Sequence, residues 1–217
     1  MINFLPRLIS GILYILIIFT SIIISKESFL LVFSIITLVV SYEAYLLSKK
    51  MKKNGFKVKY ILTPHLYVFI SMIALIYIPF AHSLTYDPYK ILLIFLMIWI
   101  TDTMSYFFGS YFGKNKLDFK ASPNKTWEGL LGGIFCSLIF SIVSFLFIKE
   151  VYPFWKTILL GITIPVFGLF GDIQQSEIKR AAGVKDSGNL IPGHGGMFDR
   201  LDSAIGNSFI ILIITIL

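Results

Sequence analysis

Charged residues are scarce in this sequence. Only 14% of its 217 residues are Asp, Glu, Lys or Arg, whereas 56% are hydrophobic. A soluble domain usually has about a quarter of its residues charged, so the composition excludes an ordinary soluble domain and predicts an integral membrane protein. Cysteine is nearly absent as well. Because Cys136 is the single cysteine, no disulfide can form within the chain, and a zinc site of the Cys-x-x-Cys kind is excluded.

Signals that would divide or process the chain are also missing. The sequence has no internal repeat and no low-complexity linker, so residues 1–217 are expected to form a single integral membrane domain. The first apolar run, residues 8–25, has the length of a signal peptide, but it lacks a clear small-residue cleavage site. We therefore interpret this run as a retained helix.

Long apolar runs are what the sequence does contain. A helix needs about 20 mostly apolar residues to cross a membrane, and only helices or closed barrels satisfy their backbone groups in lipid. The runs are too long and too continuous for barrel strands. They predict an all-α, polytopic transmembrane protein with about seven spans, near residues 5–25, 28–48, 60–80, 88–112, 127–148, 155–178 and 198–217.

The basic residues indicate how these spans are oriented. Cytoplasmic loops of membrane proteins are rich in Lys and Arg. With the N-terminus in the cytoplasm, 15 of the 19 basic residues fall on the inner side. The outer side then holds only Lys26, Lys90, Lys149 and Lys156. We therefore expect a multi-pass protein of the plasma membrane with a cytoplasmic N-terminus. The net charge of +7 is attributed to this topology and to anionic lipid headgroups near loop 49–59, and no nucleic acid partner is expected.

A carboxylate lies inside the fourth predicted span. Asp102 is about ten residues from the inner end of that span, and it shares a helix face with Tyr106. A charge at this depth is costly and usually faces a protein interior or a water-filled cavity. Asp102 is therefore a candidate site residue, and a structural ion pair is the alternative.

A polar turn, residues 122–126, precedes the fifth predicted span. Ser122 or Thr126 can cap the helix that begins at Trp127. Capping does not explain Lys125, whose positive charge near a helix N-terminus favours phosphate binding. Ser122 and Lys125 are therefore candidate substrate-binding residues.

The stretch 172–202 carries the densest charge. Along the sixth predicted span, one stripe contains Asp172, Ser176, Lys179 and Arg180. Near the start of the seventh, Asp199 and Asp202 share a face. Carboxylates without cysteine ligands suit a hard cation such as magnesium. A solvated loop with surface ion pairs is the alternative, but these carboxylates lie within predicted helices.

Cations and glycines lie beside these carboxylates. Lys179, Arg180, Lys185 and Arg200 suit phosphate groups. Gly193, Gly195 and Gly196 let the backbone approach an anion closely. His194 fits a hydrogen-bonding partner better than a metal ligand. The pattern differs from the nucleotide-binding sequence G-x-x-x-x-G-K. It predicts an inward-facing site for a metal-bound polyphosphate, with a lipid as the second substrate and phosphoryl or nucleotidyl transfer as the reaction.

These residues resemble the motifs of a known family. The order Ser176, Lys179-Arg180, Lys185-Asp186, Ile191-Pro192-Gly193-His194-Gly195-Gly196, Asp199-Arg200 and Asp202 is similar to the signature of the phosphatidate cytidylyltransferase (CDP-diacylglycerol synthase) family. Two upstream stretches resemble further family motifs: Ser122-Pro123-Asn124-Lys125-Thr126-Trp127-Glu128-Gly129, and Thr101-Asp102 with Tyr106 and Gly109. One departure is Gln175, which stands where the family often has an acidic residue.

The resemblance implies an all-helical membrane enzyme that joins CTP to phosphatidic acid, giving CDP-diacylglycerol and pyrophosphate. It implies a requirement for Mg²⁺, with room for a second cation, and a homodimer. The implied metal ligands are Asp172 and Asp199, with Asp186 and Asp202 orienting them and Asp102 as a site wall or additional ligand. The implied phosphate-holding residues are Lys179, Arg180, Lys185 and Arg200, and the implied substrate-binding residues are Ser122, Lys125, Ser176, His194, Gly195 and Gly196.

Two other functions stay open at this stage. Another acidic lipid, such as an ether lipid, can replace phosphatidic acid as the acceptor. An ion or lipid transporter would use intramembrane acids as a pathway, with polar residues in both leaflets. The acids Asp102, Asp172, Asp199 and Asp202 all gather on the predicted inner side, which favours the enzyme.

Overall fold

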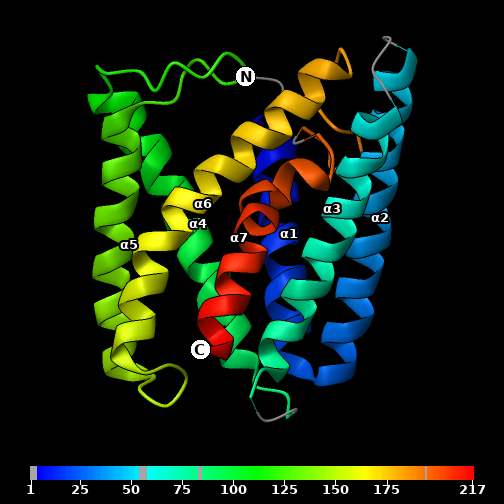
Figure 1. Ribbon diagram of the computed structural model, residues 1–217. Coiled ribbons are helices and arrows are strands. Elements are labelled where there is room, and N and C mark those ends of the chain that lie inside the picture. The colour runs from blue at the N-terminus through cyan, green and yellow to red at the C-terminus, as the bar shows by residue number, and fades with distance from the viewer. Residues whose placement is uncertain (1–3, 54–57, 83–84, 194) are drawn as a thin grey trace. The chain divides into compact units, whose positions relative to one another are not determined.

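The computed structural model describes residues 4–53, 58–82, 85–193 and 195–217. Within these ranges the chain is almost entirely helical (Figure 1). The elements are α1 (Phe4–Ile24), α2 (Lys26–Lys53), α3 (Val58–Tyr77), the short 3₁₀ helix η1 (Ile78–Phe80), α4 (Pro88–Phe112), α5 (Trp127–Phe147), α6 (Phe154–Ala181) and α7 (Phe198–Ile216). The described ranges contain no strand beyond two isolated bridges. The prediction of an all-α fold is confirmed, and every predicted span coincides with a helix.

The helices have the surface of a membrane protein. Four of them are long and apolar enough to cross a bilayer: α2 up to Lys52, α4, α5 and α6. Shorter apolar stretches are Leu8–Ile24 and Pro64–Phe80. Large apolar side chains such as Leu38 (68% exposed) and Phe135 (60% exposed) lie on the outside, whereas Ser137 and Asn207 are fully buried. Many large apolar side chains on the outside, together with buried polar ones, are typical of a multi-pass membrane protein.

Local sequence explains where two of the helices begin. The side chain of Asp87 accepts a hydrogen bond from the Tyr89 amide, and Pro88 occupies the first helical position of α4. The hydroxyl of Thr126 accepts one from the Gly129 amide at the start of α5. Of the two capping candidates in the polar turn, Thr126 is therefore the cap.

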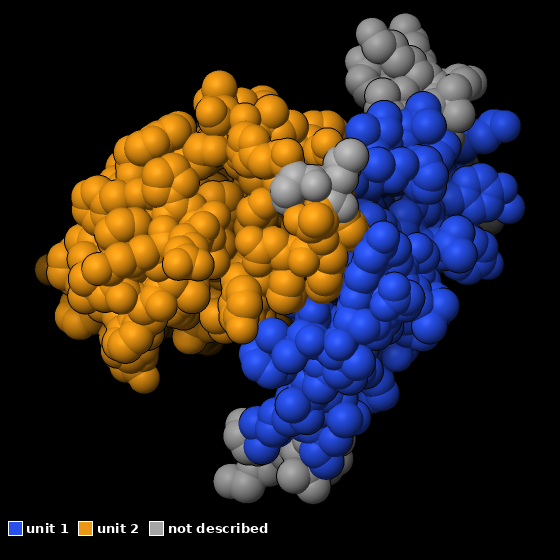
Figure 2. Space-filling view, turned by 90° about the horizontal axis from the view of Figure 1, so that it is seen from below, with its two compact units in different colours: residues 1–76, 175–202 blue, residues 77–174, 203–217 orange. Residues whose placement is uncertain are grey.

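The chain divides into two compact units, shown in different colours in Figure 2. Unit 1 consists of residues 1–76 and 175–202, and unit 2 of residues 77–174 and 203–217. Both α6 and α7 contribute to the two units, because the division falls within each helix.

In unit 1, α1 and α2 pack together and support the segment between α6 and α7. Phe29 and Phe33 of α2 are buried, with ring centroids 4.4 Å apart. From α1, the Ser10 hydroxyl donates to the Pro192 carbonyl at 3.0 Å, and the Tyr14 hydroxyl donates to the Arg200 carbonyl at 3.1 Å. The N-terminal helix therefore holds the C-terminal part of the polar segment 172–202 at two points.

In unit 2, small residues let the helices approach closely. A Cβ on Gly132 of α5 would overlap the side chain of Phe108 on α4. A Cβ on Gly206 of α7 would lie 2.5 Å from the Cα of Gly171 on α6. Close contacts at small residues are common in membrane helix pairs. The crossing of α6 and α7 fixes the backbone immediately before Asp172.

Candidate active site

Asp199, in the first turn of α7, organises the polar part of unit 1. Its Oδ1 accepts hydrogen bonds from the Lys179 ammonium at 2.8 Å and from the Gln175 amide nitrogen at 3.3 Å. Its Oδ2 accepts from the Ser187 amide at 2.8 Å, the Ser187 hydroxyl at 3.0 Å and the Gly196 amide at 3.0 Å. The side chain is only 6% exposed. Asp199 therefore joins the end of α6 to the segment before α7.

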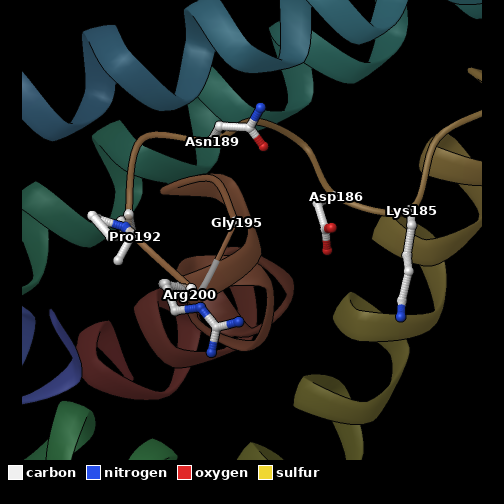
Figure 3. A pocket seen from close by; sticks show the side chains of 8 residues that line it. Lys185, Asp186, Asn189, Pro192, Gly195 and Arg200 are labelled. Atoms are coloured by element: carbon white, nitrogen blue, oxygen red, sulfur yellow. The ribbon is translucent and has the colours of Figure 1, made fainter. Parts of the chain in front are cut away.

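That segment, residues 182–193 and 195–197, is named the glycine loop here. It borders a pocket of about 550 Å³ (Figure 3). The lining residues are Lys185, Asp186, Asn189, Ile191, Pro192, Gly193, Gly195 and Arg200. Gly193 and Gly195 have φ angles of 74° and 84°, a left-handed conformation that favours glycine, and the Ile191 amide donates to the Gly195 carbonyl at 2.8 Å. This tight turn places its backbone at the edge of the pocket, which Lys185 and Arg200 also line.

The electrostatics of this pocket suit an anion. Lys185 and Arg200 approach it from the glycine loop and from α7, and Asp186 also borders it (Figure 3). Two cations and one carboxylate leave a positive balance among the charged lining residues. Arginine can bind two phosphate oxygens at once, and lysine adds a mobile point charge. The pocket can therefore hold a phosphate chain.

Other predicted site residues of unit 1 lie close by in sequence but outside the pocket lining. The Arg180 guanidinium donates to the Val184 carbonyl at 3.3 Å, which closes the end of α6. Ser176 is half-buried on α6, and Asp202 is half-buried on α7. The Gly196 amide binds Asp199, so a carboxylate of the protein occupies this donor. The prediction for His194 lies outside the described residues.

Unit 2 brings together two further residues that the sequence predicted separately for the site. The ammonium of Lys125 forms an ion pair with Oδ2 of Asp172 on α6. Their side chains are 35% and 25% exposed, so water and solutes can reach both. Asp102 of α4 accepts a hydrogen bond from the Ser203 hydroxyl of α7 at 3.0 Å. Ser122 takes part in the turn through its backbone, because its carbonyl accepts from the Lys125 amide at 3.4 Å.

A local network holds Lys125 in place. The Leu117 amide donates to the Lys125 carbonyl at 2.9 Å. The side-chain amide of Asn115 donates to Glu128 in the first turn of α5 at 2.7 Å, and the Trp127 amide donates to the Asn115 carbonyl at 3.0 Å. The loop between α4 and α5, residues 113–126, is thus hydrogen-bonded to the start of α5. This arrangement places Lys125 against Asp172.

The described residues offer a few oxygen ligands that suit a magnesium ion. Among the described residues, no group of three or more His, Cys, Asp or Glu side chains gathers as a ready-made site. Magnesium usually takes one or two protein carboxylates and keeps several waters. Asp172 fits this requirement, because it is partly exposed and binds a cation already. In unit 1 the Gln175 carbonyl oxygen is buried without a hydrogen-bond donor beside Asp199, and such an oxygen is a suitable ligand for a hard cation.

Glu43 is a residue of this region that was not predicted from the sequence. Glu43 of α2 is 6% exposed and accepts hydrogen bonds from the glycine loop and from the start of α7. A signal for it exists: Glu43 is the single charged residue between positions 28 and 48. An ionisable residue inside a predicted span marks a functional position by default, and Glu43 fits this description as well as Asp102 does.

Comparison with known proteins gives a consistent result. A model of the cytidylyltransferase family matches residues 7–217. The phosphatidate cytidylyltransferase of Staphylococcus haemolyticus (strain JCSC1435) is 50% identical over 113 residues, which cover 52% of this chain and 44% of the relative. The protein of the same name from Staphylococcus aureus (strain COL) is 50% identical over 115 residues, with the same shares of the two chains. The chain therefore spans less than half the length of these curated relatives. Because the family model covers nearly the whole sequence, this chain belongs to the cytidylyltransferase family.

Proposed function

We propose that this protein transfers the cytidylyl group of CTP to phosphatidic acid, giving CDP-diacylglycerol and pyrophosphate. The observation that carries the proposal is the match to the cytidylyltransferase family over residues 7–217, together with relatives named phosphatidate cytidylyltransferase. The pocket beside the glycine loop supports it, because Lys185 and Arg200 can hold the phosphates of a nucleotide. The apolar helices support a substrate that arrives from the bilayer.

The reaction needs little from the protein beyond positioning and charge. A phosphate oxygen of phosphatidic acid attacks the α-phosphorus of CTP, and a new P–O bond forms. The bond from the α-phosphorus to the bridging oxygen breaks, and its electron pair leaves with pyrophosphate. Because the attacking phosphate is already ionised at neutral pH, no general base is required. Lys185 and Arg200 would hold the phosphates of CTP, and Lys179 and Arg180 would add positive charge beside them.

In unit 2, Asp172 would hold a magnesium ion. In unit 1, Asp199 is the proposed metal ligand, and it would become available once Lys179 leaves its Oδ1. Asp186 and Asp202 would orient these groups, and Asp102 would be a further ligand or wall. The remaining substrate contacts would come from Ser122, Lys125, Ser176, His194, Gly195 and Gly196. A bound magnesium ion would neutralise charge on the α-phosphate and on the leaving pyrophosphate. A second cation is part of the same proposal.

The membrane arrangement follows from the charge distribution. Seven spans with a cytoplasmic N-terminus place 15 of 19 basic residues on the cytoplasmic side, where CTP is available. We propose this orientation for a single domain in the plasma membrane, with the active site on the cytoplasmic side. The family resemblance is our reason for proposing a homodimer as well.

An acceptor panel tests the substrate. Purified protein in detergent would receive magnesium, CTP labelled at the α-phosphate, and one of several lipids: phosphatidic acid, its ether-linked form, phosphatidylglycerol or phosphatidylserine. The proposal expects label in the lipid phase with phosphatidic acid. Label only with a different lipid would keep the chemistry and replace the substrate, whereas folded protein that labels none of these lipids would contradict the proposal.

Substitution of Lys185 with Gln is expected to raise the KM for CTP about tenfold and to change kcat less. Lys185 is exposed at the pocket, so its loss removes a phosphate contact with little effect on folding. Initial rates over a range of CTP concentrations measure both constants. The matched control is Lys149→Gln, because Lys149 is an exposed lysine between α5 and α6. An unchanged KM in K185Q would remove this residue from the CTP site.

A further inference from the structure

Glu43 connects the N-terminal half of the chain to the glycine loop. Its Oε2 accepts hydrogen bonds from the Ser187 hydroxyl at 2.8 Å and from the Phe198 amide at 2.9 Å. Its Oε1 accepts from the Met197 amide at 3.1 Å. All four residues belong to unit 1, and the three partners of Glu43 are 144 to 155 positions from it in the sequence. One buried carboxylate thus holds both a loop side chain and the entry to α7.

The start of α7 needs this carboxylate. The first amides of a helix have no acceptor within the helix, and a capping side chain usually supplies one. Met197 precedes the first helical residue, Phe198, and neither has a side-chain oxygen. Glu43 supplies the acceptor from α2 instead. The positive end of the α7 dipole also favours a negative charge at this position.

Two glycines show how closely the loop packs on Glu43. A Cβ on Gly188 would lie 2.7 Å from its Oε1. A Cβ on Gly196 would overlap both its Oε2 and the Ser187 hydroxyl. The backbone of the glycine loop therefore lies directly on the carboxylate, and residues with a side chain would push it away.

Ser187 links Glu43 to the site itself. Its hydroxyl lies 2.8 Å from Oε2 of Glu43 and 3.0 Å from Oδ2 of Asp199. A hydroxyl has a single proton, so Ser187 donates to one carboxylate at a time while its amide donates to Asp199. The segment between Lys185 and Asn189, which borders the pocket, is thus fixed from both sides.

We infer that Glu43 is a positioning residue, which keeps the glycine loop in the conformation that binds the phosphates of CTP. The inference rests on the proposed function, since it assigns the pocket to CTP. When only a fraction of the protein has the binding-competent loop, the apparent affinity falls by that fraction, and saturating ligand restores the active form. Loss of Glu43 therefore acts on KM rather than on kcat.

The test compares Glu43→Gln with the wild type in two measurements. Gln keeps the size but turns an N–H₂ group toward a donor, so hydrogen bonds to the carboxylate are lost. The KM for CTP is expected to rise about 10- to 100-fold, with kcat within about threefold of wild type. Hydrogen exchange of peptides covering residues 183–198 is expected to be at least about tenfold faster. Glu27→Gln, an exposed glutamate on the same helix, is the matched control.

The outcomes separate the two proposals. A purely structural role would lower thermal stability but leave the KM of the folded enzyme unchanged, and that result would overturn the inference. Unchanged hydrogen exchange would overturn it as well. A wild type without transfer activity would contradict the proposed function, whereas faster exchange in E43Q would still support the positioning of the loop. If E43Q does not fold, Gly188→Ala disturbs the same contact from the loop side and is expected to raise the KM for CTP.

Discussion

Replacement of Asp172 with Asn is expected to lower kcat for cytidylyl transfer about 100- to 1,000-fold, the largest effect that the structure leads us to expect. Asp172 is the partly exposed carboxylate that binds the Lys125 ammonium in unit 2. Asn has nearly the same shape but lacks the negative charge that holds a cation. Magnesium held at this position would neutralise negative charge on the α-phosphate and on the leaving pyrophosphate. Loss of the ion would therefore lower kcat.

The fold of this variant should persist, because the Lys125–Asp172 pair is solvent-accessible and contributes little to stability. Steady-state rates with saturating CTP and phosphatidic acid measure the effect, and thermal unfolding in detergent checks the fold. The control is Asp87→Asn, since Asn also caps helices well and Asp87 lies at the start of α4, 15 positions before Asp102 in the sequence. Wild-type kcat in D172N would exclude Asp172 as the metal ligand.

Replacement of Asp199 with Asn is expected to abolish activity and also to destabilise the protein. The variant leaves the Lys179 ammonium, whose side chain is only 13% exposed, without its negatively charged partner. Breaking a buried pair from one side typically costs about 3–5 kcal/mol. The change also removes an acceptor for Ser187 and Gly196, so the glycine loop loses its anchor in α7. Thermal unfolding and lipid labelling measure the two losses separately.

A double variant distinguishes these causes. Adding Lys179→Met to D199N removes the unpaired charge, so about half or more of the lost stability should return. Activity should stay lost, because both groups belong to the proposed phosphate and metal site. A double variant no more stable than D199N would show that the ion pair is not the source of the destabilisation. Recovery of activity would contradict the assignment of Lys179 and Asp199 to the site.

Much of the fold could be predicted from the sequence because lipid restricts a spanning chain to continuous helices. The predicted range 88–112 agrees with α4 at both ends, since Asp87 and Pro88 form a recognisable helix start. Other ends differ by a few residues: α2 and α6 continue into the polar segments beyond 48 and 178. Hydropathy indicates where contact with lipid ends, whereas a helix continues as long as its residues have a sufficient helix propensity.

The polar residues of the site could be predicted, but their pairing could not. The spacing of Asp172 and Lys179 on one helix suggested that each helps to bind a metal-bound phosphate. In the structure Lys125 contacts Asp172, and Lys179 contacts Asp199. Such pairs form between residues 20 or more positions apart, and helix periodicity gives no information about them. The partners of Glu43 could not be predicted for the same reason, because they lie more than 140 positions away in the sequence.

The most direct test of the central claim uses CTP labelled at either the α- or the γ-phosphate. Purified protein would be incubated with magnesium, phosphatidic acid and one of the two labelled nucleotides, and the lipid and aqueous phases would be counted. The account predicts that the α-label enters the lipid and that the γ-label appears in pyrophosphate, with D172N inactive in both. Label from the γ-phosphate in the lipid would indicate phosphoryl transfer, and no label in the lipid from folded protein would contradict cytidylyl transfer altogether.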